Sequence, residues 1–291
     1  VVATQAHTNP LCFGGTTTAT ITGSGGTAPY NVSWTGTTSG NPGGTEIAAS
    51  GGTYNMTGLA AGVYNVTVTD ANGCVGTVTV TVTTPTAVAA SNVPTAVSCA
   101  GGNNGSAVIT ASGGTAGYNV SWTGTTSGNP GGTEIAASGG TYNMTGLVTG
   151  VYNVTVTDAN GCTASTTVTI NPGITIDANI TPVAAQCLTG NSFTFSGSTS
   201  TISSGAITSY NWNFGAGATP ATGTGVTSPA VTYSGAGTIT VTLTVSNGTC
   251  TNVETLNITI NANPTVGALP TMVACNGGST GAIAVTANTG T

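Results

Sequence analysis

The stretch that decides the fold occurs twice without a change: YNVSWTGTTSGNPGGTEIAASGGTYNMTGL runs from Tyr30 to Leu59 and again from Tyr118 to Leu147. A second block, GVYNVTVTDANGC, follows each copy and ends at Cys74 and at Cys162. The offset of 88 residues between the copies exceeds the period of a solenoid and is close to the size of one small domain. The sequence therefore predicts a tandem array of independently folded domains.

The composition is almost free of charge. The 291 residues include no Lys or Arg, six Asp or Glu and one His, so the formal net charge is −6. Without permanent cations the chain cannot neutralise phosphates or an anionic lipid surface, which excludes nucleic-acid binding and polybasic membrane binding. The other residues are mainly Thr, Gly, Val, Ser, Ala and Asn without a long apolar run, which favours strands over helices and predicts no membrane insertion.

Short runs that alternate polar with apolar residues, separated by Gly, Asn, Asp or Pro, indicate β-strands joined by turns. In the first repeat the predicted strands are 17–22, 30–35, 45–49, 53–56, 63–69 and 77–82. Many short strands with frequent turns favour a Greek-key sandwich. The expected fold class is all-β: tandem immunoglobulin-like β-sandwich domains arranged as an elongated rod.

Two further marks indicate an immunoglobulin-like core. Leu59-x-x-Gly62-x-Tyr64, repeated at Tyr152, has the spacing of a tyrosine corner. One Trp also lies between two cysteines in each of three modules. The predicted core residues are Trp34, Trp122, Trp212, Tyr64 and Tyr152.

Seven cysteines stand at positions 12, 74, 99, 162, 187, 250 and 275. Paired in order, six of them enclose separations of 62, 63 and 63 residues: Cys12–Cys74, Cys99–Cys162 and Cys187–Cys250. Such regular spacing predicts one disulfide inside each domain and an extracellular or cell-surface location. The alternative is a set of buried free thiols.

The repeats, and the Pro-containing linkers that follow them, set the expected domain boundaries at 1–84, 85–172, 173–262 and 263–291. The last segment contains Cys275-Asn-Gly-Gly, which matches the Cys-x-Gly-Gly sequences at Cys12 and Cys99. It is therefore interpreted as the N-terminal part of a further repeat. The disulfide partner of Cys275 is then expected beyond this sequence.

At these residues the chain resembles two families. GVYNVTVTDANGC after a Trp-bearing strand, with a Cys-x-Gly-Gly start, resembles the SprB repeats of cell-surface gliding adhesins of Bacteroidota. The run YNWNFGAG at 210–217, followed by 229–233 and 237–245, resembles a PKD domain, an immunoglobulin-like fold, although Asn213 and Ala216 replace its usual acids. The resemblance implies a secreted adhesin or surface filament exported by the type IX route.

The residue types needed for catalysis are sparse. His7 lies before the first predicted strand and is expected to be an exposed bystander, while Asp70 and Asp158 are expected to shape turns by accepting backbone N–H bonds. There are two alternatives: Glu46 and Asp70 form a carboxylate pair, or Asp70 and Asn72 form a weak calcium site. The sequence predicts no catalytic residue, no metal site and no cofactor.

Surface modification and sugar binding are open possibilities. Asn-x-Ser/Thr triplets place candidate glycosylation sites at Asn31, Asn55, Asn65, Asn119, Asn143 and Asn153, although alternating Asn, Val and Thr generates such triplets by itself. Tyr30, Tyr54, Trp34 and their copies form a sugar-stacking face if they are exposed, whereas the Trp positions fit a core better.

The leading hypothesis is a non-catalytic structural and adhesive stalk, because weak contacts sum along an array. Its expected partners are neighbouring copies of the same chain, other repeats of the same protein, and surface glycans. A second hypothesis is an extracellular fibre subunit that assembles by strand addition. A third makes the domains spacers of a secreted glycan-degrading enzyme.

Overall fold

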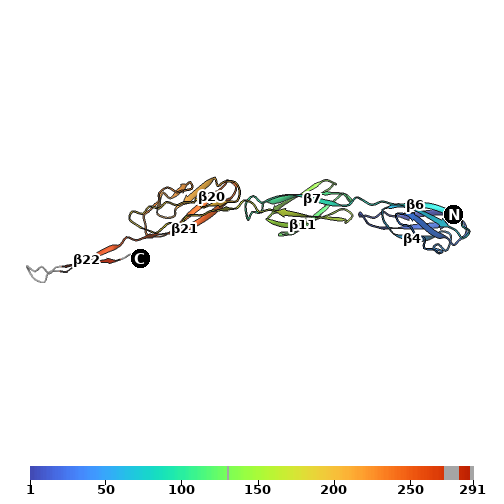
Figure 1. The fold of residues 1–291 in the computed structure, drawn as a ribbon, viewed down its shortest axis with the longest axis horizontal. Coiled ribbons are helices and arrows are strands. Elements are labelled where there is room, and N and C mark those ends of the chain that lie inside the picture. The colour runs from blue at the N-terminus through green and yellow to red at the C-terminus, as the bar shows by residue number, and fades with distance from the viewer. Residues whose placement is uncertain (130, 272–281, 289–291) are drawn as a thin grey trace, which may run out of the picture. The chain divides into compact units, whose positions relative to one another are not determined.

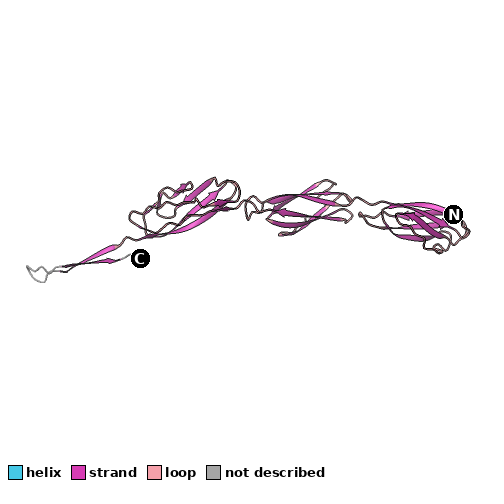
Figure 2. Ribbon diagram, viewed as in Figure 1, coloured by secondary structure: helices cyan, strands magenta, loops and turns pink. Residues whose placement is uncertain are grey.

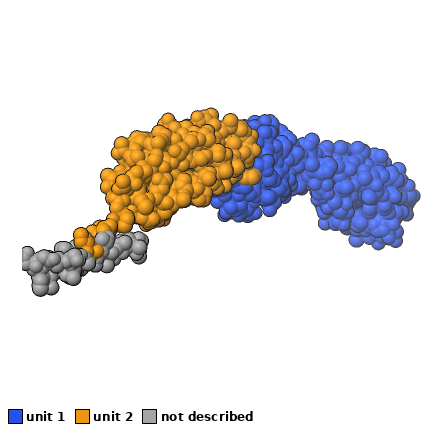
Figure 3. All heavy atoms as spheres, turned by 60° about the vertical axis from the view of Figure 1, so that its left-hand side comes forward, with its two compact units in different colours: residues 1–97, 103–171 blue, residues 98–102, 172–291 orange. Residues whose placement is uncertain are grey.

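The computed structural model describes residues 1–129, 131–271 and 282–288, and every regular element in these residues is a β-strand (Figures 1 and 2). Among the described residues, no helix is long and apolar enough to cross a membrane. The chain forms two compact units, one of residues 1–97 and 103–171 and one of 98–102 and 172–291 (Figure 3). The expected all-β, immunoglobulin-like fold class is confirmed.

The first sandwich, in the first unit, consists of two three-stranded antiparallel sheets with the orders β1-β2-β4 and β3-β5-β6. Its strands are β1 Val2–His7, β2 Thr17–Ser24, β3 Asn31–Gly36, β4 Gly52–Leu59, β5 Gly62–Thr69 and β6 Val75–Val82. Alternation in the sequence explains the two faces. In β5, Tyr64 and Val66 are fully buried while Val63 and Asn65 are exposed, because successive side chains point to opposite sides of a sheet.

The strand predictions for this sandwich were wrong in two places: they left out a strand at residues 2–7, and they placed one at 45–49 that does not form. Residues 2–7 form β1, which pairs with β2 along its whole length from Val2–Ser24 to His7–Ala19. Residues 45–49 form no strand, and only Ile47 makes a single bridge to Tyr30. The buried side chain of Ile47 explains why its sequence resembles a strand: it closes the core from a loop.

The second sandwich, also in the first unit, repeats this plan with sheets in the orders β7-β8-β10 and β9-β11-β12. Its strands are β7 Ala89–Thr95, β8 Gly105–Ser112, β9 Asn119–Gly124, β10 Thr141–Leu147, β11 Gly150–Thr157 and β12 Thr163–Ile170. The strands β5 and β11 share the sequence GVYNVTVT and the same burial pattern. The two sandwiches therefore have separate cores of matching composition.

The third sandwich lies in the second unit and is built around a five-stranded sheet in the order β14-β21-β20-β16-β18. The pairs β13–β15 and β17–β19 complete it. Its strands are β13 Ile176–Asp177, β14 Gln186–Cys187, β15 Thr201–Ile202, β16 Ser209–Asn213, β17 Ala218–Thr219, β18 Thr222–Thr224, β19 Thr232–Tyr233, β20 Gly237–Ser246 and β21 Thr251–Asn261. Its core is rich in aromatic rings, among them Phe193, Phe195, Trp212 and Phe214.

Within 263–291, the segment interpreted as part of a further repeat, the described residues form the antiparallel pair β22 Thr265–Thr271 and β23 Ala282–Asn288. Cys275 lies outside the described residues.

The predicted core residues divide into two groups. Tyr64 and Tyr152 are fully buried, and their hydroxyls donate to the carbonyls of Ala60 and Val148 at 2.9 Å, which is the hydrogen bond of a tyrosine corner. Trp212 is buried in the third core. The prediction was wrong in part for the other two indoles, Trp34 and Trp122, which are half-buried at the edge of their cores.

Candidate functional site: the cysteine turns and loops

Each repeat presents one cysteine on a tight turn, at the end where the chain enters the sandwich. In the first sandwich this turn joins β5 to β6, and Asp70 shapes it by accepting N–H bonds from Thr27, Asn72 and Cys74 at 2.8 to 3.0 Å. The turn closes with the Asp70 N–H bonded to the Cys74 carbonyl at 2.9 Å. The expectation that Asp70 forms a turn through backbone N–H bonds is confirmed.

The second sandwich reproduces this turn. Asp158 accepts N–H bonds from Thr115, Asn160 and Cys162 at 2.8 to 2.9 Å. The third sandwich uses Asn247 in the same role, because its side-chain oxygen accepts the N–H of Cys250 at 2.8 Å. We call Cys74, Cys162 and Cys250 the turn cysteines.

The backbone donors stabilise the ionised form of both aspartates. The N–H of Thr27, followed by those of Cys74 and Asn72, lowers the pKa of Asp70 below its ordinary value of 3.8. Burial of Asp158 opposes ionisation, but the N–H groups of Thr115, Cys162 and Asn160 outweigh it and lower the pKa of that carboxyl as well. Both side chains are therefore carboxylates wherever the domains are folded at neutral pH.

We expect acid to destabilise the first two sandwiches through these aspartates. Because the folded pKa lies below the unfolded one, this stabilisation is complete above about pH 4 and is lost as the pH falls below 3.8 through the folded pKa. The double variant D70N/D158N should be less stable at pH 7 and show a flatter acid-unfolding profile, measured by circular dichroism. The variant E254Q, which removes an exposed carboxylate of β21, should keep the wild-type profile. Equal profiles for D70N/D158N and the wild type would contradict the assignment.

The other cysteine of each sandwich lies at the opposite end, where the chain leaves: Cys12 and Cys99 lie in loops, and Cys187 lies in the two-residue strand β14. In the first sandwich the loop between β1 and β2 carries Cys12, and its Asn9 accepts the N–H of Thr83 at 3.0 Å. In the second, the residues on both sides of Cys99 bond to Ile174, which follows β12. In the third, Cys187 pairs with Asn261 at the end of β21. We call Cys12, Cys99 and Cys187 the loop cysteines.

This placement overturns the pairing of the cysteines in sequence order. The loop that carries Cys12 is bonded through Asn9 to Thr83, just past the end of β6, and Cys74 lies at the start of β6, so the eight residues of β6 separate the two ends by roughly 23 Å at about 3.3 Å per residue. Disulfide-bonded cysteines have Cα atoms within about 7 Å of each other. The pairs Cys12–Cys74, Cys99–Cys162 and Cys187–Cys250 are therefore excluded by the length of the strand that lies between their members.

The disulfides instead join a loop cysteine to the turn cysteine of the following sandwich. Cys12 is bonded to Cys162 and Cys99 to Cys250, each pair with a Cα–Cα distance of 5.6 Å and sequence separations of 150 and 151 residues. Among the residues that the structure describes, Cys74 and Cys187 are free and exposed. The six cysteines thus follow a staggered pattern, in which each bridge links two consecutive modules.

The two bridges have the same surroundings. The carbonyl oxygen of Leu11, the residue before Cys12, lies 3.5 Å from the sulfur of Cys162. The carbonyl oxygen of Ser98, the residue before Cys99, lies 3.5 Å from the sulfur of Cys250. The side chain of Asn160 also donates to the Leu11 carbonyl at 3.4 Å. The repeated geometry indicates one kind of junction used twice.

His7 is not the exposed bystander expected from the sequence. It belongs to β1, and its side chain is partly buried. One ring nitrogen lies 2.8 Å from the side-chain oxygen of Gln5, and the other lies 3.0 Å from the carbonyl of Thr81 in β6. Because β1 and β6 belong to different sheets, His7 connects the two layers of the sandwich.

Four of the six carboxylates, those of Glu46, Asp70, Glu134 and Asp158, accept backbone N–H bonds. Glu46 and Glu134 accept the N–H groups of Val32 and Val120 at 2.9 and 2.8 Å. In the part of the chain that the structure describes, no group of three or more His, Cys, Asp or Glu side chains is placed to hold a metal ion. The oxygens of Asp70 already accept three N–H bonds. To bind calcium, the carboxylate would have to give up these bonds.

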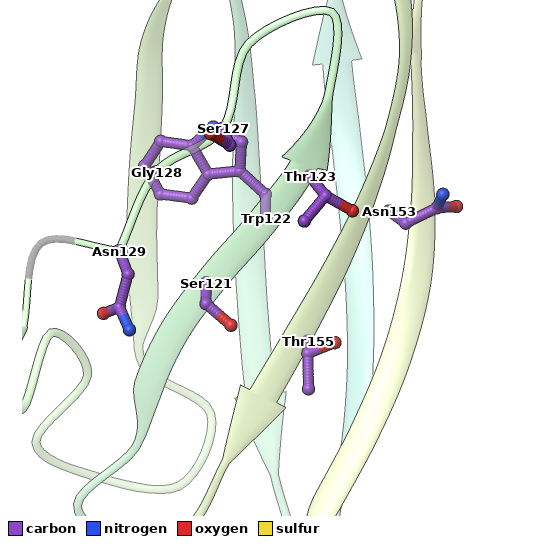
Figure 4. A pocket seen from close by; sticks show the side chains of 8 residues that line it. All are labelled: Ser121, Trp122, Thr123, Ser127, Gly128, Asn129, Asn153 and Thr155. Atoms are coloured by element: carbon purple, nitrogen blue, oxygen red, sulfur yellow. The ribbon is translucent and has the colours of Figure 1, made fainter.

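An open trough on the outer face of the second sandwich is lined by Trp122, Ser121, Thr155 and Asn153 (Figure 4). Gly128 lies against the indole, where a Cβ atom would come within 2.2 Å of the ring, so only glycine lets the loop cross there. Trp34 packs near Tyr54 in the first sandwich at 6.2 Å between ring centroids. Tyr30 and its copy Tyr118 are fully buried, so the alternative of a sugar-stacking face does not include them.

The candidate glycosylation sites fall into two classes. Asn31 and Asn119 donate their side-chain amides twice to nearby loops, so their nitrogens are engaged. The side chains of the other four candidates are exposed on strands: Asn55, Asn65, Asn143 and Asn153. Glycosylation at these four stays a prediction.

Two family models match the chain. A SprB repeat matches residues 91–127 and a PKD domain matches residues 177–260. The resemblance inferred from the sequence is confirmed by these matches. A comparison with curated protein sequences found no match.

The solved structures that match this chain are distant from it in sequence. Three N-terminal domains of the highly immunogenic outer capsid protein of bacteriophage RB49 are 14% identical, covering 90% of this chain and 98% of that one, with a TM-score of 0.33. Invasin, a bacterial integrin-binding protein, is 17% identical, covering 92% of this chain and 62% of that one, with a TM-score of 0.31. With TM-scores of 0.33 and 0.31, these two matches carry no argument about this chain.

Proposed function

Because the chain contains a SprB repeat and a PKD domain, we propose that it is a non-catalytic stalk segment of a large secreted bacterial surface adhesin, built to carry tension. These domain types support an extracellular adhesive or structural role. Export by the type IX route of Bacteroidota is part of the proposal and is supported by the SprB repeat. The disulfides agree with an oxidising compartment outside the cytoplasm.

The observation that carries the proposal is the staggered pattern of the two bridges. Between Cys12 and Cys250 the covalent structure offers three parallel routes, because three backbone segments connect the two bridges. One follows the backbone through 13–98 and crosses from Cys99 to Cys250. Another crosses from Cys12 to Cys162 and follows the backbone through 163–249. The third crosses both bridges and follows the backbone through 100–161. A pull on the chain can therefore be shared between three segments of polypeptide, and no single bridge carries every route.

The second sandwich contains the shortest of these routes. The segment 100–161, which contains β8, β9, β10 and β11, connects Cys99 to Cys162. Its 62 residues are fewer than the 86 of 13–98 and the 87 of 163–249, so this segment sets the limit on how far the two bridges can separate. Such an arrangement serves a stalk, which must hold its length under force, and has no role in catalysis.

Single-molecule stretching of the chain from its two ends tests this proposal. With both bridges intact, the span from Cys12 to Cys250 should extend to about 23 nm at most, because the shortest route, from Cys99 to Cys162, has 63 residue steps at about 3.6 Å each. After reduction the whole segment between these residues is released, and the span should reach about 85 nm.

The variant C12S/C99S/C162S/C250S is the matched control and should reach the longer span with or without reductant. A wild-type chain that extends equally before and after reduction would show that the bridges do not carry tension, and the proposed stalk function would then be wrong.

A further inference from the structure

The two free cysteines of the described residues, Cys74 and Cys187, stand at equivalent positions to cysteines that are bonded elsewhere in the same structure. Cys74 is a turn cysteine of the first sandwich, and Cys187 is a loop cysteine of the third. In the staggered pattern each of them lacks its partner, since a turn cysteine bonds backward to a preceding module and a loop cysteine bonds forward to a following one.

The turn that holds Cys74 has the geometry of the turn that holds the bonded Cys162. The N–H of each cysteine donates to its aspartate at 2.8 Å, and each cysteine carbonyl accepts the aspartate N–H at 2.9 Å. The side chain of Asn72 bonds to the Thr27 hydroxyl at 2.9 Å, and that of Asn160 bonds to Thr115 at 2.8 Å. Cys74 is therefore presented on a turn already shaped for a bridge.

The backbone of Cys187 likewise matches that of the bonded Cys99. Each lies parallel to the segment by which the chain leaves its sandwich, Cys187 beside Asn261 and Cys99 beside Ile174. The residue after each cysteine donates its N–H to that segment, at 2.8 Å from Leu188 and at 3.0 Å from Ala100. These contacts hold an exposed thiol at the end of the sandwich where the next module would dock.

We propose that Cys74 and Cys187 are the two open ends of the staggered disulfide ladder and that each is a covalent docking site for a further sandwich of this type. Cys187 accepts the turn cysteine of a following sandwich, and Cys74 accepts the loop cysteine of a preceding one. The pairing is directional, because loop and turn cysteines lie at opposite ends. The partner module belongs either to the same polypeptide or to a second copy of this chain, in which case Cys187 of one copy bonds to Cys74 of the next.

The bond forms by thiol–disulfide exchange with an organic disulfide as oxidant. The first thiolate attacks the oxidant, breaks its sulfur–sulfur bond and releases one small thiol. The thiolate of the docked partner then attacks the mixed disulfide and releases the second. The two cysteines are oxidised by two electrons in total, and the oxidant is reduced to two thiols that carry away the two protons.

The test begins with the chain carrying C275S, which removes the cysteine outside the described residues. In this background the chain has two free thiols, and oxidised glutathione is added to the folded protein. Where a second copy is the partner, the result is a ladder of multimers on a non-reducing gel and a linked peptide containing Cys74 and Cys187 in the mass spectrum. A protease that needs neither Lys nor Arg must be used, since the chain has none.

Direction is tested with C74S and C187S, both in the C275S background. Each variant alone should stay monomeric, and a mixture of the two should give a dimer and nothing larger, because only the pair Cys187 and Cys74 remains. If either single variant alone forms homodimers in the same yield as the mixed dimer, the two thiols bond without any preference for each other. This result would overturn the proposal.

The source of the partner is tested by joining two copies of the chain in one polypeptide. If the Cys187–Cys74 bond forms in the joined copies but not between separate chains, the partner belongs to the same polypeptide. If it forms in both, a second copy of the chain can be the partner. Absence of the bond in both forms overturns the proposal. This result is separate from the stretching experiment, which depends only on the bridges of Cys12 and Cys99, so the proposed stalk function can stand without the open ends.

Discussion

Reduction of the two disulfides should weaken the protection of β11 against hydrogen exchange more than that of β5, although the two strands have the same sequence, GVYNVTVT. β5 belongs to the first sandwich, where Cys12 is bonded and Cys74 is free. β11 belongs to the second sandwich, whose cysteines, Cys99 and Cys162, are both bonded to other modules. The pair of strands is therefore an internal control for the effect of the second bridge.

The physical reason lies in the unfolded chain. When one sandwich unfolds while its neighbours stay folded, a bridge keeps its chain closed into a loop, which removes conformational entropy and raises the free energy of the unfolded form. For loops of this length one bridge contributes about 4 kcal/mol, or roughly a thousandfold in the opening equilibrium. A second bridge acts on a chain that is already restricted, so its contribution should be smaller than the first.

The measurement is native-state hydrogen exchange of the peptides that contain β5 and β11, with and without reductant. In the oxidised chain β11 should exchange more slowly than β5, and after reduction the two rates should approach each other. The variant C12S/C99S/C162S/C250S should show the reduced pattern under both conditions. Equal exchange of β5 and β11 in the oxidised wild type would contradict this account.

Replacement of Phe195 by alanine should lower the free energy of unfolding of the third sandwich by about 3 to 5 kcal/mol. The ring of Phe195 is fully buried and lies between those of three other residues. Its centroid is 6.0 Å from Phe193, 5.7 Å from Phe214 and 6.1 Å from Trp212. Removal of the ring opens a cavity and breaks several aromatic contacts, each worth about 1 kcal/mol beyond burial.

Denaturant unfolding with hydrogen exchange in β20 measures this loss, because β20 contributes Val241, Leu243 and Val245 to the same core. The variant F195L, which keeps most of the volume, should lose under about 1.5 kcal/mol. The control V253A removes an exposed side chain of β21 and should change stability by under about 0.5 kcal/mol. If F195A and V253A unfold at the same denaturant concentration, the aromatic cluster does not hold this domain together.

Local patterns were sufficient to predict the sandwich and several of its details. The alternation in GVYNVTVT predicted a half-buried strand, and the spacing from Leu59 to Tyr64 predicted the tyrosine corner that the structure shows. The turn role of Asp70 also followed from residues close by in the sequence. In each case the signal and the structure lie within a few residues, so no knowledge of the rest of the fold was needed.

Features that depend on distant parts of the chain were missed. The segment 2–7 has no strong alternation of its own and forms β1 because it pairs with the edge of β2. The contact of His7 with Thr81 joins positions that are remote in sequence. Trp34 and Trp122 were expected in the core, but a loop, and not the opposite sheet, covers the indole of Trp122.

The sequence by itself determined that the chain contains similar β-sandwiches in succession, with two regularly placed cysteines in each of three modules. Repeats and alternation can be read directly from the order of the residues. The sequence did not determine which cysteines meet. Partners 62 or 63 residues apart and partners 150 or 151 residues apart are equally regular. Only the tertiary structure decided between them, because each strand runs from one end of its sandwich to the other and holds the two cysteines of a module too far apart to bond.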